Sequence, residues 1–366
     1  MSLNSLSDAD ATMELGDYDY ELPEASIAQR PVEPRDLSRL LVVDRGGKAL
    51  RDMRVRDLPT LLPRGALLVV NDTRVVPARL VGCKDTGGRV ELLMTAPFAD
   101  GSNSLCGQWA LTRSSKPLRV GQIIHIDGSS GGAKARVTET APAGLVAFDF
   151  DSASDLTDLL ERCGRVPLPP YIRGGQEDAS GSDAAAYQCV FAARRGAVAA
   201  PTAGLHLSTA LLDSLAEAGV ERCAITLHVG PGTFLPVRDD DLRGHRVLPE
   251  RFEVSAESAE RLQAARTDRR PVIAVGTTTT RTLETLAARF DGAPWRATAG
   301  HTDLTILPGH RFRGIDGLVS NFHMPRSSLL VLVASFVGRQ RILAAYDHAV
   351  ASGYRFYSYG DATLIC

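Results

Sequence analysis

The sequence of 366 residues contains no long apolar run and no apolar segment at its start. Its longest apolar stretch, residues 328–338, falls well short of the roughly 20 residues that a membrane-spanning helix requires, so it predicts a buried helix. The first residues include acids and no hydrophobic core, so we expect a flexible tail over residues 1–16 and not a secretory signal peptide. We therefore expect a cytoplasmic protein with no membrane partner.

Metal-binding and several common catalytic motifs are also missing. The six cysteines lie far apart, with no C-x-x-C pair and no zinc-type spacing, so we expect a reducing compartment and no metal. The chain has no Walker A, H-E-x-x-H or G-x-G-x-x-G motif. The sequence therefore gives no support to a kinase, a zinc protease or a dinucleotide-dependent enzyme.

Charge of one sign is scarce, because the net charge is only −2. The charge is unevenly spread, however: residues 30–84 contain 12 lysines and arginines against 6 aspartates and glutamates. Such a segment could meet phosphates, but a solvated arginine-rich surface would give the same count. No aromatic residues interrupt the segment, which argues against a stacking platform for single-stranded nucleic acid.

Two kinds of pattern divide the chain. Residues 65–151 alternate short apolar runs with glycine turns and show no helical period, which predicts an antiparallel β-barrel or sandwich. From residue 196 onward, strand-like runs feed capped helices and then further strands, as in β-α-β units. We therefore predict a mixed, partly parallel α/β domain, residues 17–64 and 152–366, interrupted by an inserted antiparallel β-barrel domain, residues 65–151.

Three histidines occupy matching places in this pattern. His206, His228 and His323 each follow an apolar, strand-like run and lie beside glycine, proline, threonine or asparagine. Loops at strand ends are where open α/β sheets bind ligands, so the repetition favours one shared site with these histidines as proton-transfer groups. The alternative for each is a satisfied structural histidine near the core.

Other polar and glycine residues in the same loops are candidates for substrate binding. The run that starts at Gly276 follows a buried strand and opens a helix, so its free N–H groups suit a carboxylate or phosphate. A helix cap, a tight turn or a loop cap is the alternative at each of these places. The candidate substrate-binding residues are Asn71, Arg74, Thr202, Gly204, Gly230, Gly232, Thr233, Gly276, Thr277, Thr278, Arg281, Asn321 and Asp361.

Nine phrases taken together make the pattern specific. In chain order they are DYDYELPEASIAQRP, LLVVNDTRVVPARL, PLPPYI, YQCVFA, GAVAAPTAGLH, TLHVGPGTF, IAVGTTTTRTLE, SNFHMPRSSLL and YRFYSYGDATLI. The chain resembles, over nearly its whole length, the S-adenosylmethionine:tRNA ribosyltransferase-isomerase family of queuosine biosynthesis. That resemblance implies an α/β domain interrupted by a β-barrel.

The resemblance also implies an activity. An enzyme of this family transfers and isomerises the ribosyl part of S-adenosylmethionine onto 7-aminomethyl-7-deazaguanine at the wobble position of tRNA, giving epoxyqueuosine, adenine and methionine. S-adenosylmethionine would be consumed as a co-substrate, with no metal or redox cofactor. The loop from Thr277 to Arg281 would hold the methionine carboxylate or an RNA phosphate, and Asn321 the adenine or deazaguanine edge. We expect the protein to act as a monomer.

Four positions depart from the family pattern, namely Cys189, Leu207, Leu248 and Thr363, and Leu248 bears most on function. Where the family tends to show a second histidine shortly after the one that matches His245, this chain has Leu248, which neither transfers protons nor accepts hydrogen bonds. The same ribosyl chemistry on an amine or deazapurine that is not part of tRNA therefore stays open as an alternative. A non-catalytic RNA-binding protein is a separate alternative from another class.

Overall fold

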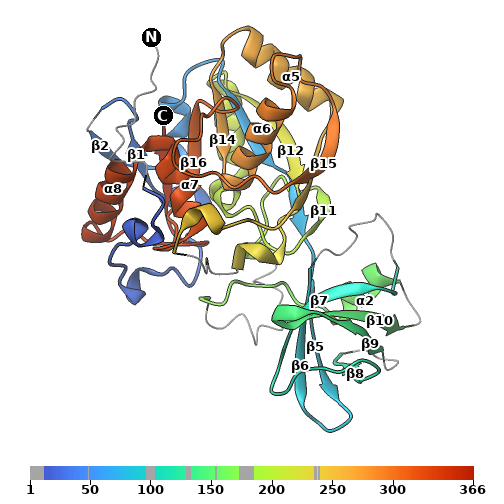
Figure 1. Ribbon diagram of the computed structural model, residues 1–366. Helices are drawn as coiled ribbons and strands as arrows, with labels where there is room; N and C mark the ends of the chain where they lie inside the picture. The colour runs from blue at the N-terminus through green and yellow to red at the C-terminus, as the bar shows by residue number, and fades with distance from the viewer. Residues whose placement is uncertain are drawn as a thin grey trace.

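The computed structural model describes residues 12–47, 49–95, 104–128, 133–152, 155–172, 185–234, 237 and 240–366. Figure 1 shows an α/β part and a smaller β part that projects from it, with the chain leaving the α/β part after residue 75 and returning after the barrel. Residues 1–11 of the expected tail lie outside the described residues.

A nine-stranded mixed sheet forms the centre of the α/β part. The strands β12, β3, β14 and β16 are adjacent and parallel, and antiparallel pairs extend the sheet on both sides. The strand order is β15 (Thr298–Thr302), β13 (Glu250–Val254), β12 (Glu221–Leu227), β3 (Leu67–Asn71), β14 (Val272–Val275), β16 (Gly317–Asn321), β17 (Ala362–Ile365), β1 (Arg39–Val43) and β2 (Leu50–Arg54).

Helices cover both faces of this sheet. Successive residues of a strand point to opposite sides, so a strand that is apolar throughout presents an apolar surface on each face. Leu68 and Val70 of β3 pack with the short α1 (Leu58–Leu61) and with α4 (Thr209–Glu217), on what we term the α4 face. Leu67 and Val69 point to the opposite side, termed the α6 face. This second face is covered by α5 (Ala256–Thr267), α6 (Thr277–Arg289), α7 (Ser328–Val337) and α8 (Arg339–Ala351).

Local sequence explains where these helices begin. Ser208, Ser255 and Ser327 each accept a hydrogen bond from a backbone N–H of the first turn of α4, α5 and α7. Gly276 precedes α6 with φ of 89°, a backbone conformation that favours glycine. The apolar stretch predicted as a buried helix is α7, confirmed here. Within the described residues, a bilayer-crossing length of apolar helix arises only if α7 and α8 are joined across their 114° bend.

The β part is a closed antiparallel barrel, which confirms the predicted fold class. Its apolar interior also receives Leu156, Leu159 and Leu160 from helix α2 (Leu156–Cys163). The strands run around the barrel in the order β10 (Leu145–Asp151), β7 (Gln108–Ser114), β6 (Arg89–Met94), β5 (Arg79–Lys84), β8 (Ile123–Ile126) and β9 (Lys134–Thr140).

The strand pairing moves both edges of the inserted segment relative to the prediction of residues 65–151. Strand β3 pairs with β12 and β14 in the large sheet, so residues 67–71 belong to the α/β part. At the other end, α2 packs into the barrel interior instead of the α/β core. The all-buried pattern of β3 is that of a central strand in the large sheet. The barrel with its helix spans residues 79–163.

Two smaller expectations also change. The run before His206 was expected to start a β-α-β unit, but its strand β11 (Arg194–Ala197) pairs only with β4 (Thr73–Val75), in a two-stranded sheet at the base of the barrel. Residues 12–16 are not a free tail, because Leu15 is buried and its N–H donates to the Asp240 carbonyl.

Candidate functional site

The carboxyl ends of the four parallel strands meet at one edge of the sheet. Asn71 ends β3, His228 follows β12, Gly276 follows β14 and Asn321 ends β16. These residues were predicted from separate sequence phrases, and strand order brings them to the same edge. Ligands of open α/β sheets bind at this edge, so it is the candidate active site.

The three histidines do not all lie on the same face of the sheet. In β16, Leu318 packs on the α6 face and Val319 on the α4 face, so Ser320 points to the α6 face and Asn321 to the α4 face. Ser320 contacts His323, whereas Asn321 contacts His206. The expectation of one pocket shared by three histidines is therefore corrected.

His206 lies on the α4 face at the end of a short 3-10 helix, η7 (Thr202–His206). Its Nε2 is 3.1 Å from Nδ2 of Asn321, and both side chains are buried. Burial, together with the nearby charges of Arg355 and Arg35, lowers the pKa of His206 to about 4. The imidazole is therefore neutral near pH 7.

His228 directly follows β12. Ala224, four residues earlier in that strand, packs on the α4 face, so the side chain of His228 points to the same face. Its Nδ1 lies 2.8 Å from the hydroxyl of Thr73. Gly196 must be glycine here, because a Cβ at that position would stand only 2.8 Å from Nδ1 of the ring. Burial lowers the pKa of His228 to about 4, with a smaller contribution from Arg251. His228 is thus a second neutral imidazole at the edge.

His323 has the surroundings of a structural residue. Its ring Nε2 is 2.8 Å from the Ser320 hydroxyl. Its backbone N–H donates to the Tyr346 hydroxyl, and its backbone carbonyl accepts from the Tyr20 hydroxyl. Tyr20 and Tyr346 pack edge to face, and Phe322 packs on Tyr346 in the same way. Burial alone lowers the pKa of His323 to about 4. On this geometry the structural alternative fits His323 better than a catalytic role.

The start of α6 is joined to the neighbouring strand by Asn71. The Asn71 amide donates to the Leu227 carbonyl and the Thr278 hydroxyl and accepts from the N–H groups of Leu227 and Thr73. All of its hydrogen-bonding capacity is used inside the protein, so the structure assigns it to holding β3, β12 and α6 together. The hydroxyls of Thr279, Thr280 and Thr282 each donate to the carbonyl four residues back, which leaves Thr277 and Thr278 as the threonines at the helix start.

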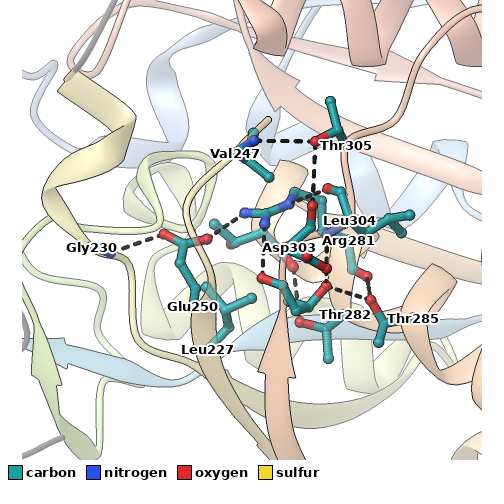
Figure 2. A network of polar contacts seen from close by, with 12 residues as sticks. Leu227, Gly230, Val247, Glu250, Arg281, Thr282, Thr285, Asp303, Leu304 and Thr305 are labelled. Atoms are coloured by element: carbon teal, nitrogen blue, oxygen red, sulfur yellow. Dashed lines mark hydrogen bonds and ion pairs between the residues drawn. The ribbon is translucent and has the colours of Figure 1, made fainter. Parts of the chain in front are cut away.

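Arg281 does not face the candidate anion site. Figure 2 shows its guanidinium pointing to the Glu250 carboxylate, with which it forms a buried ion pair. It also donates to the carbonyls of Leu304 and Thr302. The second oxygen of Glu250 accepts from the N–H of Gly230, 2.9 Å away. This network ties the loop after His228 to α6 and occupies the charge that was expected to bind substrate.

The glycine loop after His228 lies beside Leu248, which departs from the family pattern. Gly232 belongs to the 3-10 helix η8 (Pro231–Phe234), as does Thr233, whose side chain lies outside the described part. A Cβ on Gly232 would lie 3.2 Å from the Leu248 side chain, which is 52% exposed. Leu248 thus presents an apolar surface beside this loop.

The remaining candidates occupy different places. Gly204 lies against Cys189 and Phe191, where a Cβ would clash, and Thr202 begins η7. Arg74 is exposed on β4 at the base of the barrel. The buried Asp361 accepts from the N–H groups of Arg39 and Arg355. Asp361 therefore fixes the start of β17 and of β1, whereas Arg74 is open to a ligand.

Three residues of the site were not predicted. They are Thr73, which contacts His228, Glu250, which pairs with Arg281, and Tyr357, whose carbonyl accepts from Asn321 at 3.0 Å. Tyr357 has φ of 71°, which is rare outside glycine and frequent at functional sites. Thr73 was adjacent to the candidate Arg74 in sequence, but Glu250 and Tyr357 carried no local signal.

Two further observations concern ligands. Across the described ranges, no three His, Cys, Asp or Glu side chains gather closely enough to hold a metal ion. A surface hollow of about 580 Å³ is lined by residues of β3, α4 and β12, including Leu68, Leu212 and Arg222. None of the predicted site residues lines this hollow, so we place the site at the carboxyl edge on chemical grounds.

Comparison with known proteins gives a consistent result. A family model described as "Queuosine biosynthesis protein" matches residues 15–365. The S-adenosylmethionine:tRNA ribosyltransferase-isomerases of Anaeromyxobacter sp. (strain Fw109-5) and Acidithiobacillus ferrooxidans are each 50% identical to this chain. These matches cover 96% and 95% of this chain, and 99% and 97% of the relatives.

A solved structure is also similar. The crystal structure of an S-adenosylmethionine tRNA ribosyltransferase from Thermotoga maritima has 32% sequence identity and a TM-score of 0.54. The match covers 96% of this chain and 100% of that protein. The likeness therefore extends over both the α/β part and the barrel.

Proposed function

The chain belongs to the queuosine biosynthesis protein family and is an enzyme, and from this premise we propose its reaction. The enzyme transfers and isomerises the ribosyl group of S-adenosylmethionine onto 7-aminomethyl-7-deazaguanine at position 34 of tRNA. The products are epoxyqueuosine-tRNA, adenine and methionine. The observation that carries the proposal is the pair of neutral imidazoles, His206 and His228, on one face of the carboxyl edge.

The reaction has definite chemical demands. A base removes the C5′ proton next to the sulfonium, and a donor assists adenine as its bond to the ribosyl carbon breaks. A carbon–nitrogen bond forms to the aminomethyl group, and methionine leaves with the electron pair of the carbon–sulfur bond as the epoxide closes. No net oxidation occurs, so the enzyme has to supply proton transfer and orientation.

His228 suits the base. Thr73 Oγ1 lies 3.4 Å from the Arg194 carbonyl, which only accepts, and 2.8 Å from His228 Nδ1. If the hydroxyl proton points to the carbonyl, the oxygen accepts from Nδ1–H, and the lone pair of Nε2 is free to take a proton. Thr73 would then hold the tautomer that proton abstraction requires.

The methionine carboxylate would bind at the start of α6. The helix has 13 residues, and its first N–H groups lie beside Gly276 and the hydroxyls of Thr277 and Thr278. Because Arg281 is already paired with Glu250, the site would use the helix terminus in place of a guanidinium. Asn321 and His206 would then face the adenine end of the co-substrate.

The decisive experiment supplies both substrates. We expect purified protein, S-adenosylmethionine and tRNA bearing the aminomethyl-deazaguanine to release adenine and methionine in equal amounts and to form an epoxide-bearing nucleoside. Mass spectrometry of the digested tRNA and chromatography of the small molecules measure the three products. A tRNA with guanine at position 34 is the control. Absence of adenine release above that control contradicts the proposal.

A second candidate function differs only in the acceptor. At position 248, where the family pattern has a histidine, this chain places the apolar side chain of Leu248 against Gly232 in the loop after His228. This favours testing the free deazapurine amine as an acceptor in parallel with tRNA. Faster adenine release with the free base would identify this alternative.

Membership of an enzyme family argues against the remaining alternative, a non-catalytic RNA-binding protein. The expectations of a cytoplasmic monomer that uses no metal or redox cofactor stay predictions. Metal independence would appear as unchanged adenine release after dialysis against a chelator.

A further inference from the structure

The orientation of the Asn321 amide follows from the Tyr357 backbone. Tyr357 O can only accept a hydrogen bond, so the atom of Asn321 that lies 3.0 Å from it must be the amide nitrogen. The left-handed backbone of Tyr357, with φ of 71°, holds this carbonyl in place against its conformational cost. The amide nitrogen and oxygen of Asn321 are therefore distinguished by their chemistry.

The same amide nitrogen then fixes the proton on His206. Nδ2 of Asn321 is 3.1 Å from His206 Nε2, and an amide nitrogen only donates, so Nε2 must be the acceptor. A neutral imidazole that accepts at Nε2 carries its proton on Nδ1. Burial and the charges of Arg355 and Arg35 keep this imidazole neutral near pH 7.

The other end of the amide is left without a partner. Within the described chain, the buried Oδ1 of Asn321 has no hydrogen-bond partner, although the residue is only 3% exposed. A buried amide oxygen without a partner is costly and is frequently found where a ligand completes the site. Oδ1 is therefore available to accept a hydrogen bond from a ligand N–H or O–H.

We infer that Asn321 and the Tyr357 carbonyl hold His206 as its Nδ1–H tautomer, so that His206 and Asn321 together present one donor and one acceptor to a purine-like ligand edge. This use of the pair rests on the proposed function, in which a donor assists the departure of adenine. His206, which stays neutral, then donates a hydrogen bond from Nδ1–H to a ring nitrogen of adenine, His228 is the base that takes the C5′ proton, and Tyr357 is a positioning residue. A purine carries ring nitrogens that accept and an exocyclic amine that donates, which matches the pair.

The tautomer can be measured without any activity. In the full-length protein with ¹⁵N-labelled histidine, we expect the NMR signals of His206 to show a protonated Nδ1 and an unprotonated Nε2 at pH 7. The His206→Gln variant assigns these signals. A protonated Nε2 in the wild-type protein overturns the inference, whether or not the proposed reaction is correct.

The catalytic use is tested by Asn321→Asp. A carboxylate accepts where the amide donated, so the proton should move to Nε2, and adenine release should slow by about 100-fold, the range seen when a hydrogen-bond donor to developing charge is lost. Should this variant not fold, the matched pair His206→Asn and His206→Gln replaces it, because the Asn amide reaches the Nδ1 position and the Gln amide the Nε2 position. Higher turnover with Asn than with Gln supports the inference, and equal or reversed turnover overturns it.

Discussion

Two neighbouring residues of β16, Ser320 and Asn321, hold two histidines in opposite surroundings. Asn321 binds His206 on the α4 face, and its Oδ1 has no partner among the residues that the structure describes. Ser320 binds His323 on the α6 face, where the hydroxyls of Tyr20 and Tyr346 are hydrogen-bonded to the His323 backbone. Both histidines are buried, and burial lowers the pKa of both to about 4. A shifted pKa therefore does not separate a catalytic histidine from a structural one, and the hydrogen-bond partners do.

The largest test of this comparison removes each histidine in turn. We expect His206→Ala to lower kcat for adenine release by about 100-fold, because removing one hydrogen-bond donor to the charge that develops in the transition state typically costs roughly 10²- to 10³-fold. The double variant Ser320→Ala with His323→Leu removes both hydrogen-bonding partners on the α6 face and should keep kcat within a fewfold of wild type. Steady-state kinetics on folded protein, checked by circular dichroism, measures both. A large loss of kcat in the double variant would contradict the assignment.

The presence of the histidines at strand ends was predictable, but the face each occupies was not. Apolar runs that end in glycine, proline or asparagine identified the loops of His206, His228 and His323. The face depends on whether a residue is odd or even within β16, and therefore on where the strand begins and on its register with β14 and β17. Tertiary pairing decides that register.

The boundary of the barrel was missed for a similar reason. Residues 67–71 read as one more short β run, although a strand buried at all five positions is typical of the centre of a parallel sheet. Arg281 was assigned to substrate because its partner, Glu250, lies 31 residues away in sequence. Partners that are distant in sequence leave no local pattern, which is why the fold class was predicted better than the site.

The second test concerns the ion pair on the α6 face. Glu250→Gln leaves the Arg281 charge buried and unpaired, so we expect the free energy of unfolding to fall by about 3–5 kcal/mol. The double variant Glu250→Gln with Arg281→Met removes the unpaired charge and should recover much of that loss. Urea unfolding followed by fluorescence measures the change. A decrease in the free energy of unfolding below about 1 kcal/mol would mean that the ion pair does not stabilise the position of the Gly230 loop and that α6 is held by apolar packing alone.

A third test uses pH to sharpen the contrast between stability and catalysis. The pKa of His206 and of His323 is about 4 in the folded protein and ordinarily 6.5, so between these values the unfolded chain binds more protons. Stability is therefore retained above pH 6.5 and lost as the pH falls toward 4, by at most about 1.4 kcal/mol per pH unit for each histidine.

Variants at either histidine should reduce that slope by a similar amount, whereas the pH profile of kcat should change only with His206. Urea unfolding at pH 7, 6 and 5 for wild type, His206→Gln and His323→Leu measures the slopes. The comparison fails if His323→Leu alters the pH profile of kcat, or if neither variant changes the slope of stability.

The smallest expected decrease in kcat comes from removing the Thr73 hydroxyl, which contacts His228. Thr73→Val keeps the shape of the side chain but removes the hydroxyl that lies 2.8 Å from Nδ1. A single neutral hydrogen bond contributes about 0.5–1.5 kcal/mol, which corresponds to a decrease in kcat of roughly 2- to 13-fold. Thr73→Ser restores the hydroxyl and should recover wild-type kcat, which a defect in packing would not. Equal turnover in the valine and serine variants would show that Thr73 does not orient His228, and the base would then have to be sought among the other groups at the carboxyl edge.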